Sequence, residues 1–446
     1  MRVDIREHAM FQSFMRQYYP QYKPVKVKGI TIDSRLVQAG DMYIALKGDR
    51  VDGHRFISEA ESSGAAFIVS EQDAEAGIPL IRVSSTRQFL MEFAQKWWIG
   101  FSTPVVGITG SNGKTTTKEL LVHVLQPFTS TAWMPGNYNS TIGLPLSLFT
   151  MPASSDIAVF EIGSSAPGEI KKLTEIIHPN IGLITNVHPA HIEFFSTLAH
   201  LAEEKSELLK NLPGDGVAFI NLDDPSISSM DTPAKKITFS FKVSADFCGR
   251  WSKNNGSPVL TINEREVTLP IKSETLAKNA LAVYSICYTL GINHEDIASQ
   301  ISTFALPEGR GNVIEKNRMR VINDTYNANP ESVRAGIEAA LSLLPDRRHI
   351  LVLGDMFELG VHTLEYHRQI GEFIKHNSQI ILITYGPLSG VISEICTSHG
   401  MECYHFTASA AITHFINHFR RPGDIYFVKG SRGMRMETII KEGIFA

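Results

Sequence analysis

The sequence of 446 residues lacks the features of a membrane protein or of a disulfide-stabilised secreted one. No apolar run reaches the roughly 18 residues that a membrane-spanning helix needs, and the segment MRVDIREHAMFQSF has no apolar stretch of the signal-peptide kind. The four cysteines form no CxxC pair, which gives no support to a zinc site or a disulfide framework. We therefore expect a cytoplasmic protein without a membrane span, with free buried thiols at Cys248, Cys287, Cys396 and Cys403.

An excess of charge of one sign is also missing. The chain has 42 Lys and Arg residues against 46 Asp and Glu residues, which gives a formal net charge of −4. This balance offers no broad basic face, so we expect no nucleic acid partner. With 43% apolar and 20% charged residues, the composition is that of a globular enzyme, and the length predicts about two to four domains.

The order of apolar and glycine-rich segments predicts three α/β domains, covering residues 1–100, 101–305 and 306–446. In the first range, KGITIDSR and GDMYIALKG are typical of short strands, with Gly40 and Gly48 as turn signals. The other two ranges alternate apolar strands with amphipathic helices, which predicts a mostly parallel, doubly wound sheet in the centre and a second, Rossmann-like unit after it. The stretch from Leu306 to Gly311 is the expected hinge.

The predicted elements that support this division are short and well separated. In the central range the strands are Ile157–Ile162, Ile181–Val187, Val217–Asn221 and Val105–Thr109, and the helices are Thr115–Leu125, Leu198–Leu209 and Leu276–Leu290. In the last range the strands are Val321–Ile322, Ile350–Leu353, Ile380–Thr384 and Ile425–Val428.

The strongest chemical signal is the run Gly107-Ile-Thr-Gly-Ser-Asn-Gly-Lys-Thr-Thr-Thr117, between an apolar strand and a helix. Glycines allow backbone N–H groups to turn toward a phosphate, and the start of the helix adds partial positive charge. Lys114 is placed to reach the outer phosphates of a nucleotide, and the Thr115 hydroxyl suits magnesium. The generic phosphate-loop pattern has a glycine where Ile108 stands, so an ordinary glycine-rich turn is the alternative.

Two strand ends in the central range carry polar groups. Glu161 ends an apolar strand, at the edge where ligands bind in such sheets, and is a candidate magnesium ligand. Capping of the next helix is its alternative role. His188 and His191 follow the neighbouring strand; they are either surface turn residues or part of the site, and spacing does not rank them. In the last range, Asn323-Asp-Thr-Tyr-Asn-Ala-Asn-Pro330 is either a nucleotide clamp or a helix cap.

Together these segments resemble the Mur ligase family over essentially the whole chain. Gly110-Ser-Asn-Gly-Lys-Thr-Thr116 is similar to the family's own phosphate loop. The resemblance implies that Glu161 and His191 bind magnesium and that Lys205 is carbamylated. From its own neighbours alone, Lys205 would be a solvated helix residue paired with glutamates. The implied metal site is Thr115, Glu161, His191 and Lys205.

The same resemblance implies the remaining site residues. ATP is expected to bind at Asn279, at Arg310 of the hinge, at Asn327 and Asn329, and at the loop residues Gly110, Ser111, Asn112, Gly113, Lys114, Thr115 and Thr116. Lys114, Glu161, His191, Lys205 and Asp324 are the expected catalytic group. The substrate-binding residues implied in the N-terminal domain and in the segment after the first central helix are Ser34, Arg35, Lys47, Asp52, His54, Asn137 and Asn139.

The implied activity is ATP-dependent amide-bond formation through an acyl-phosphate, in peptidoglycan precursor synthesis. Residues 1–100 would bind the UDP end of UDP-N-acetylmuramoyl-tripeptide, residues 101–305 ATP with Mg²⁺, and residues 306–446 the incoming amine. Tyr326-Asn-Ala-Asn-Pro330, Gly354–Gly360 and Lys429–Arg432 are most characteristic of the member that adds D-alanyl-D-alanine. The alternatives are another ligase, adding a diamino acid or acting on folates, and a regulatory ATPase. We expect a monomer.

Overall fold

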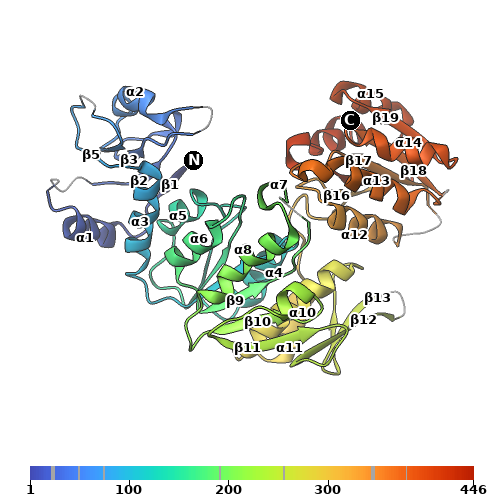
Figure 1. Ribbon diagram of the computed structural model, residues 1–446, viewed down its shortest axis with the longest axis horizontal. Coiled ribbons are helices and arrows are strands. Elements are labelled where there is room, and N and C mark those ends of the chain that lie inside the picture. The colour runs from blue at the N-terminus through green and yellow to red at the C-terminus, as the bar shows by residue number, and fades with distance from the viewer. Residues whose placement is uncertain are drawn as a thin grey trace.

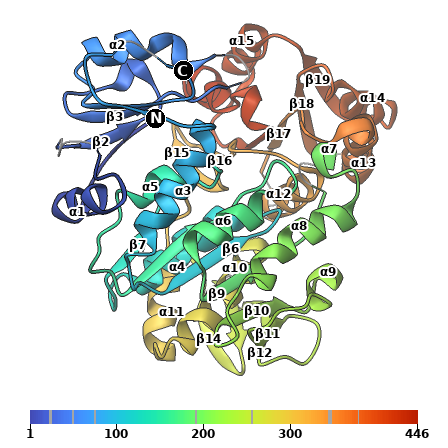
Figure 2. The same ribbon diagram turned by 60° about the vertical axis from the view of Figure 1, so that its left-hand side comes forward.

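Three domains follow one another along the chain, each built on its own sheet (Figure 1). The computed structural model describes residues 1–21, 26–48, 51–73, 76–189, 192–254, 257–342, 347–377 and 379–446. The N-terminal and C-terminal domains both lie on the same side of the central domain, and the second view shows the same arrangement (Figure 2). The predicted three-domain α/β class is therefore confirmed.

The N-terminal domain has a sheet of five strands in the order β1-β2-β3-β4-β5. Only β1 runs antiparallel to its neighbour. Its elements are β1 (Arg2–Asp4), α1 (His8–Tyr18), β2 (Gly29–Thr31), η1 (Ser34–Leu36), β3 (Asp41–Ile44), η2 (Gly53–Phe56), α2 (Ile57–Ser62), β4 (Phe67–Ser70), β5 (Leu80–Arg82) and α3 (Thr86–Trp98).

The central domain has a sheet of nine strands in the order β14-β13-β12-β11-β10-β9-β6-β8-β7. The strands from β7 to β12 are parallel, whereas β12, β13 and β14 form antiparallel hairpins that strand–helix alternation did not predict. The strands are β6 (Val105–Thr109), β7 (Thr131–Trp133), β8 (Ile157–Glu161), β9 (Ile181–Ile184), β10 (Val217–Asn221), β11 (Lys235–Ser240), β12 (Phe247–Asn254), β13 (Ser257–Ile262) and β14 (Arg265–Thr268).

Helices cover both faces of this central sheet, which explains why β6 and β8 are apolar at nearly every position. Side chains of α4, α10 and α11 form one core, and those of α6 and α8 belong to the other. The helices are α4 (Lys114–Leu125), α5 (Gly143–Leu148), α6 (Glu169–Ile177), α7 (Ile192–Phe195), α8 (Leu198–Lys210), α9 (Pro225–Ser228), α10 (Glu274–Thr289) and α11 (His294–Ser302).

The C-terminal sheet has the order β15-β16-β20-β17-β18-β19, with only β15 antiparallel. Helices α12, α13 and α14 pack on one face of the sheet, and α15, α16 and η5 pack on the other. The elements are β15 (Asn312–Lys316), β16 (Met319–Asp324), α12 (Pro330–Leu341), β17 (His349–Gly354), η3 (Gly360–His362), α13 (Thr363–Ile374), β18 (Ile380–Tyr385), α14 (Gly390–Ser398), β19 (Glu402–Phe406), α15 (Ser409–Phe419), β20 (Ile425–Lys429), η4 (Arg432–Met434), α16 (Glu437–Ile439) and η5 (Ile440–Ile444).

The two junctions between domains differ in kind. One apolar core runs without a break from α1 and α3 into one face of the central sheet, and Trp97 and Trp98 donate their indole N–H groups to Leu148 O and Ile177 O across this junction. The C-terminal cores contain only residues of the C-terminal domain. Movement of the C-terminal domain about residues 306–311 would therefore leave the other two domains packed together.

Two further sequence-based expectations can be compared with the structure. All four cysteines are free, but only Cys287 and Cys396 are buried. Cys248 and Cys403 are partly exposed, so the expectation of four buried thiols is wrong for these two: both stand on strands at or near a sheet edge. Among the helices of the described residues, none is long and apolar enough to cross a membrane.

Candidate active site

A glycine loop, residues Gly110–Gly113, joins β6 to the start of α4. Gly110 and Gly113 have φ values of +147° and +81°, which L-residues with a Cβ rarely adopt. A Cβ at Gly113 would also lie 2.8 Å from Asn279 Oδ1 on α10. Glycine is therefore required at this position both by the backbone and by the closeness of α10.

The segment after β9, residues 185–188, holds the glycine loop through hydrogen bonds. Asn186 Oδ1 accepts a hydrogen bond from Asn112 N at 2.9 Å, and Thr185 Oγ1 donates to Asn112 O at 2.7 Å. Ser111 is held twice by His188, whose carbonyl oxygen accepts from Ser111 Oγ and whose N–H donates to it. These contacts fix the backbone of the loop and leave the Asn112 side chain to a partner elsewhere.

Lys114, the first residue of α4, folds back over this loop. Its ammonium group donates to Gly110 O at 2.7 Å and to Ser111 O at 3.1 Å. Burial lowers the pKa of Lys114, with Arg310 acting in the same direction and Glu161 opposing both. These contacts hold a cation directly above the loop, where an anion would meet it.

Glu161 lies at the end of β8, and it does not cap the next helix, which begins at Glu169. One of its carboxylate oxygens accepts from Thr115 Oγ1 at 2.7 Å, and the other accepts from Asn139 Nδ2 at 2.6 Å. Arg310 donates to the same Thr115 hydroxyl at 2.8 Å. The hinge arginine, the helix threonine and the strand carboxylate therefore form one connected group.

Lys205 is buried, with 4% of its surface exposed. It lies on α8, and the glutamates around it have other partners: Glu203 and Glu207 pair with Lys210, and Glu204 accepts from backbone N–H groups at the start of α6. None of the described residues makes a hydrogen bond or ion pair with its ammonium group. Burial, and next the charge of Lys114, shift the pKa of Lys205 well below its ordinary value. The alternative of a solvated, glutamate-paired lysine is thus wrong.

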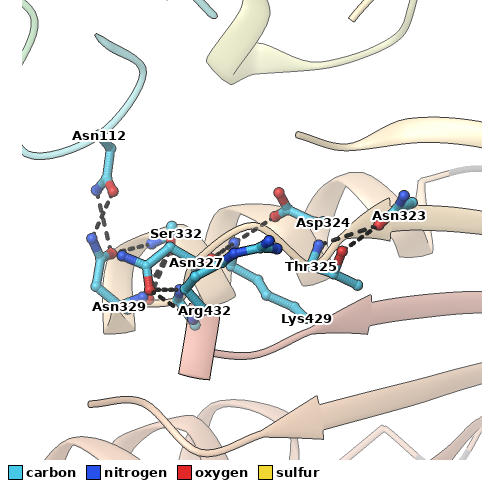
Figure 3. A network of polar contacts seen from close by, with 10 residues as sticks. Asn112, Asn323, Asp324, Thr325, Asn327, Asn329, Ser332, Lys429 and Arg432 are labelled. Carbon is cyan, nitrogen blue, oxygen red and sulfur yellow. Dashed lines mark hydrogen bonds and ion pairs between the residues drawn. The ribbon is translucent and has the colours of Figure 1, made fainter. Parts of the chain in front are cut away.

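The C-terminal domain contacts the glycine loop through a pair of asparagines (Figure 3). Asn329 Nδ2 donates to Asn112 Oδ1 at 2.6 Å, and Asn112 Nδ2 donates in return to Asn329 Oδ1 at 3.3 Å. Asn329 also caps α12, in a reciprocal capping box with Ser332. The helix-cap role considered for this cluster is confirmed for Asn329, and the same side chain also contacts the neighbouring domain.

An ion pair joins the ends of the neighbouring parallel strands β16 and β20. Lys429 Nζ donates to Asp324 Oδ2 at 2.6 Å and to Asn327 O at 2.9 Å (Figure 3). Nearby, the guanidinium carbon of Arg310 lies 3.5 Å from the centroid of the Tyr326 ring. This is a cation–π contact between the hinge and the segment that follows β16. Asp324, Asn327 and Asn329 are thereby fixed on one surface that faces the central domain.

A cavity of about 810 Å³ lies between the central and C-terminal domains. It brings together most of the predicted residues and adds His188. Its lining includes Ser111, Asn112, Gly113, Lys114, Thr115, Thr116, Asn137, Asn139, Glu161, His188, Lys205, Asn279, Arg310, Asp324, Tyr326, Asn327, Asn329 and Lys429. His191 lies outside the described residues.

The five residues predicted in the N-terminal domain are not among those lining this cavity. Arg35 is mostly exposed and pairs with Asp33, and Ser34 donates to Glu59. Lys47 and Asp52 form an isolated antiparallel β-bridge through their backbones, and the Asp52 carboxylate accepts from the ring and the backbone N–H of His54. These residues make polar contacts within the N-terminal domain and do not line the cavity.

Sequence reasoning missed three residues of the cavity wall and its support. Lys429 and Tyr326 had been noted only as parts of motifs, and their contacts became visible only with the strand order and the hinge position. Asn186 follows the same strand as His188, and its side chain holds the glycine loop. A signal was present, since each stands at the carboxyl end of an apolar strand or two residues beyond it, in a mostly parallel sheet.

The Thr115 hydroxyl and the Glu161 carboxylate offer oxygen atoms, the ligand type that Mg²⁺ prefers. Within the described ranges, no group of three or more His, Cys, Asp or Glu side chains is placed to hold a metal ion. Thr115 and Glu161 would therefore need further oxygen donors, such as substrate phosphates.

Three family models match successive parts of the chain. They are described as "Mur ligase family, catalytic domain" for residues 26–98, "Mur ligase middle domain" for residues 108–287, and "Mur ligase, glutamate ligase domain" for residues 309–432. Together they cover all three domains.

Two curated relatives are similar over nearly the whole length. The UDP-N-acetylmuramoyl-tripeptide–D-alanyl-D-alanine ligase of Bacillus subtilis is 32% identical over 432 residues, covering 95% of this chain and 94% of that protein. The enzyme of the same name from Haemophilus influenzae is 32% identical over 434 residues, covering 93% of each.

Two solved structures share the fold. MurF from Acinetobacter baumannii has a TM-score of 0.87 at 26% identity, with 98% of both chains covered. The MurF ligase from Thermotoga maritima, solved in complex with ADP, has a TM-score of 0.83 at 29% identity, covering 93% of this chain and 96% of that one.

Proposed function

This chain belongs to the Mur ligase family, and we propose that it is the ATP-dependent ligase that joins D-alanyl-D-alanine to UDP-N-acetylmuramoyl-tripeptide in peptidoglycan synthesis. The carrying observation is that one cavity gathers the glycine loop, the Thr115–Glu161 pair and the Asp324–Asn329 segment of the C-terminal domain. The curated relatives with this activity in their names match across all three domains.

ATP is proposed to bind with its phosphates on the glycine loop. Backbone N–H groups of Gly113 to Thr116 and the start of α4 favour negative charge there. Lys114, now resting on Gly110 O and Ser111 O, would move a short way to the outer phosphates. Asn279, packed against Gly113, would line the nucleotide site from α10.

Magnesium fits the donors at the inner end of this cavity. Thr115 and Glu161 would hold it, with His191 as the further ligand that the family resemblance implies. When bound, the metal would neutralise charge on the transferring phosphoryl group. Asn139 and Arg310 orient the two oxygen donors through the hydrogen bonds described above.

Lys205 is proposed to be carbamylated. Its burial and the charge of Lys114 favour the neutral amine, which is the form that attacks carbon dioxide. The nitrogen forms a bond to the carbon and loses a proton, which leaves an anionic carbamate. This change would convert a buried amine, for which no described residue is a partner, into an anion beside Lys114 whose oxygen atoms suit Mg²⁺.

Two chemical steps follow from this arrangement. An oxygen of the peptide carboxylate attacks the γ-phosphorus of ATP, ADP leaves, and an acyl-phosphate results. The amine of D-alanyl-D-alanine then attacks the acyl carbon, phosphate leaves with the former carboxylate oxygen, and the nitrogen loses a proton. Lys114 offsets the charge of the phosphoryl oxygens in the first step.

The C-terminal domain would complete the site from above. Arg310 donates to Thr115 and stacks on Tyr326. Asn329 pairs with Asn112, so the glycine loop and the Asp324–Asn329 segment are already in contact. Asp324, Asn327 and Asn329 would contact ATP from the C-terminal side of the cavity. The amine substrate would enter from the same domain.

The UDP end of the muramoyl-peptide is proposed to bind the N-terminal domain. The proposed contacts in that domain are Ser34, Arg35, Lys47, Asp52 and His54, whereas Asn137 and Asn139 reach the cavity from the loop after β7. Because the N-terminal and central domains share one core, the substrate would bridge two surfaces of constant separation.

The activity can be tested with a panel of amines. With ATP, Mg²⁺ and UDP-N-acetylmuramoyl-tripeptide, we expect kcat/KM for D-alanyl-D-alanine to exceed that for D-alanine, L-lysine or diaminopimelate by about 10²-fold or more, as a site built for two residues and a terminal carboxylate would give. Product mass and phosphate release are measured together. A preference for one of the single amino acids would indicate another ligase, and phosphate release independent of any amine would indicate a regulatory ATPase.

A further inference from the structure

Lys118 is a lysine without exposed surface, one helical turn after Lys114 on α4. Its ammonium group donates to Met134 O at 2.7 Å and to Gly136 O at 2.8 Å, and it pairs with Glu119 at 2.8 Å. A buried charge is costly unless every hydrogen is used. An apolar side chain would fill the same space at lower cost, so the two carbonyl contacts point to a specific role.

These two carbonyl groups belong to the loop that follows β7, the edge strand of the central sheet. The loop, residues Met134–Ser140, has no helix or strand of its own, and Gly136 has a φ of +71°. A loop at the edge of a sheet has few ladder hydrogen bonds to hold it. Lys118 supplies two contacts from the core side, so its removal would free the first half of the loop.

The second half of the same loop orients Glu161. Asn139 donates through Nδ2 to Glu161 Oε1 at 2.6 Å, and its carbonyl accepts from Gly163 N at 2.9 Å. Thr115, also on α4, holds the other oxygen of the carboxylate. Helix α4 therefore controls Glu161 twice: directly through Thr115, and indirectly through Lys118 and the loop.

We propose that Lys118 is a positioning residue of the active site, which rests on the proposed function of Glu161 and of the cavity. It fixes the Met134–Ser140 loop so that Asn139 orients the Glu161 carboxylate and Asn137 faces the bound muramoyl-peptide. Lys118 itself lies behind the cavity wall and is not among the residues that line it. Its effect is thus on the placement of the acceptor substrate and of Glu161, and the glycine loop keeps its own supports.

The test compares K118M, K118R and the control E119Q, which breaks the ion pair but keeps both carbonyl contacts. In free K118M, hydrogen exchange of peptides covering Met134–Ser140 should be faster by about tenfold, with the glycine loop unchanged. Its kcat should fall by about 10²-fold, the effect of a misplaced group, and KM for the muramoyl-peptide should rise while ADP affinity stays within about threefold. K118R should retain more activity than K118M, and E119Q should match wild type.

A second variant keeps the test decisive if K118M does not fold. N139A alters a surface loop, and it should show the same kcat and KM pattern, while the K118R/N139A double variant should be no slower than the slower single variant. Independent, multiplying effects would overturn the proposal, as would a fall in kcat of folded K118M or K118R without faster exchange in Met134–Ser140. Exchange and ADP binding are measured without the acceptor substrate, so they stand apart from any failure of the proposed ligase activity.

Discussion

Lys114→Ala is expected to abolish turnover and leave the fold intact, with a fall in kcat of about 10³-fold or more. The ammonium group stands above the glycine loop, and its charge matters most as negative charge builds on the transferring phosphoryl group. Its hydrogen bonds are to its own loop, which Asn186, Thr185 and His188 hold independently. The loss should therefore appear in catalysis and not in the melting temperature.

The measurement is steady-state phosphate release, with the melting temperature as the check on folding. Lys171→Ala, at an exposed position of α6, serves as the matched control and should behave as wild type. A folded Lys114→Ala enzyme with activity within a few-fold of wild type would remove Lys114 from the reaction.

Lys205→Ala is expected to be nearly inactive, with kcat lower by about 10²-fold or more, because it removes the proposed carbamate, whose oxygen would help to hold the metal. Short carboxylic acids such as acetate should restore part of the activity, since they can occupy the vacated space and offer the same type of oxygen. The structure supports this expectation through the burial of Lys205, its lowered pKa and its place in the cavity wall.

The matched control is Lys210→Ala on the same helix. Lys210 is partly exposed and pairs with Glu203 and Glu207, and exposed pairs contribute little, so this variant should keep wild-type activity and gain nothing from acetate. Near-normal activity of Lys205→Ala, without any response to acetate, would show that no carbamate acts at this position.

The parts of the fold that follow from local sequence could be predicted. The glycine loop between β6 and α4 lies where expected, because the positive φ values at Gly110 and Gly113 are encoded by the glycines themselves. The position of Glu161 at the end of a buried parallel strand was also predicted, from the apolar run that precedes it. The antiparallel strands β12–β14 were missed. The prediction relied on the alternation of strands with helices, and no helix separates these three strands in the sequence.

Long-range contacts could not be predicted from the sequence. Asn112 and Asn329 are 217 positions apart, and nothing local to either residue indicates that their amides pair. Lys205 shows the same limit in another way. Its neighbouring glutamates suggest a solvated helix face. In the structure, however, Glu204 accepts from the start of α6, and Glu203 and Glu207 pair with Lys210. Lys205 instead lines the cavity.

The transfer of oxygen from the acceptor carboxylate to phosphate tests the central claim most directly. The enzyme is supplied with ATP, Mg²⁺, D-alanyl-D-alanine and UDP-N-acetylmuramoyl-tripeptide carrying ¹⁸O in its reacting carboxylate, and the phosphate and the peptide product are analysed by mass spectrometry. An acyl-phosphate ligase gives one ¹⁸O atom in each phosphate released and one amide product for each ATP consumed. Unlabelled phosphate, or ATP consumed without amide product, would contradict the account.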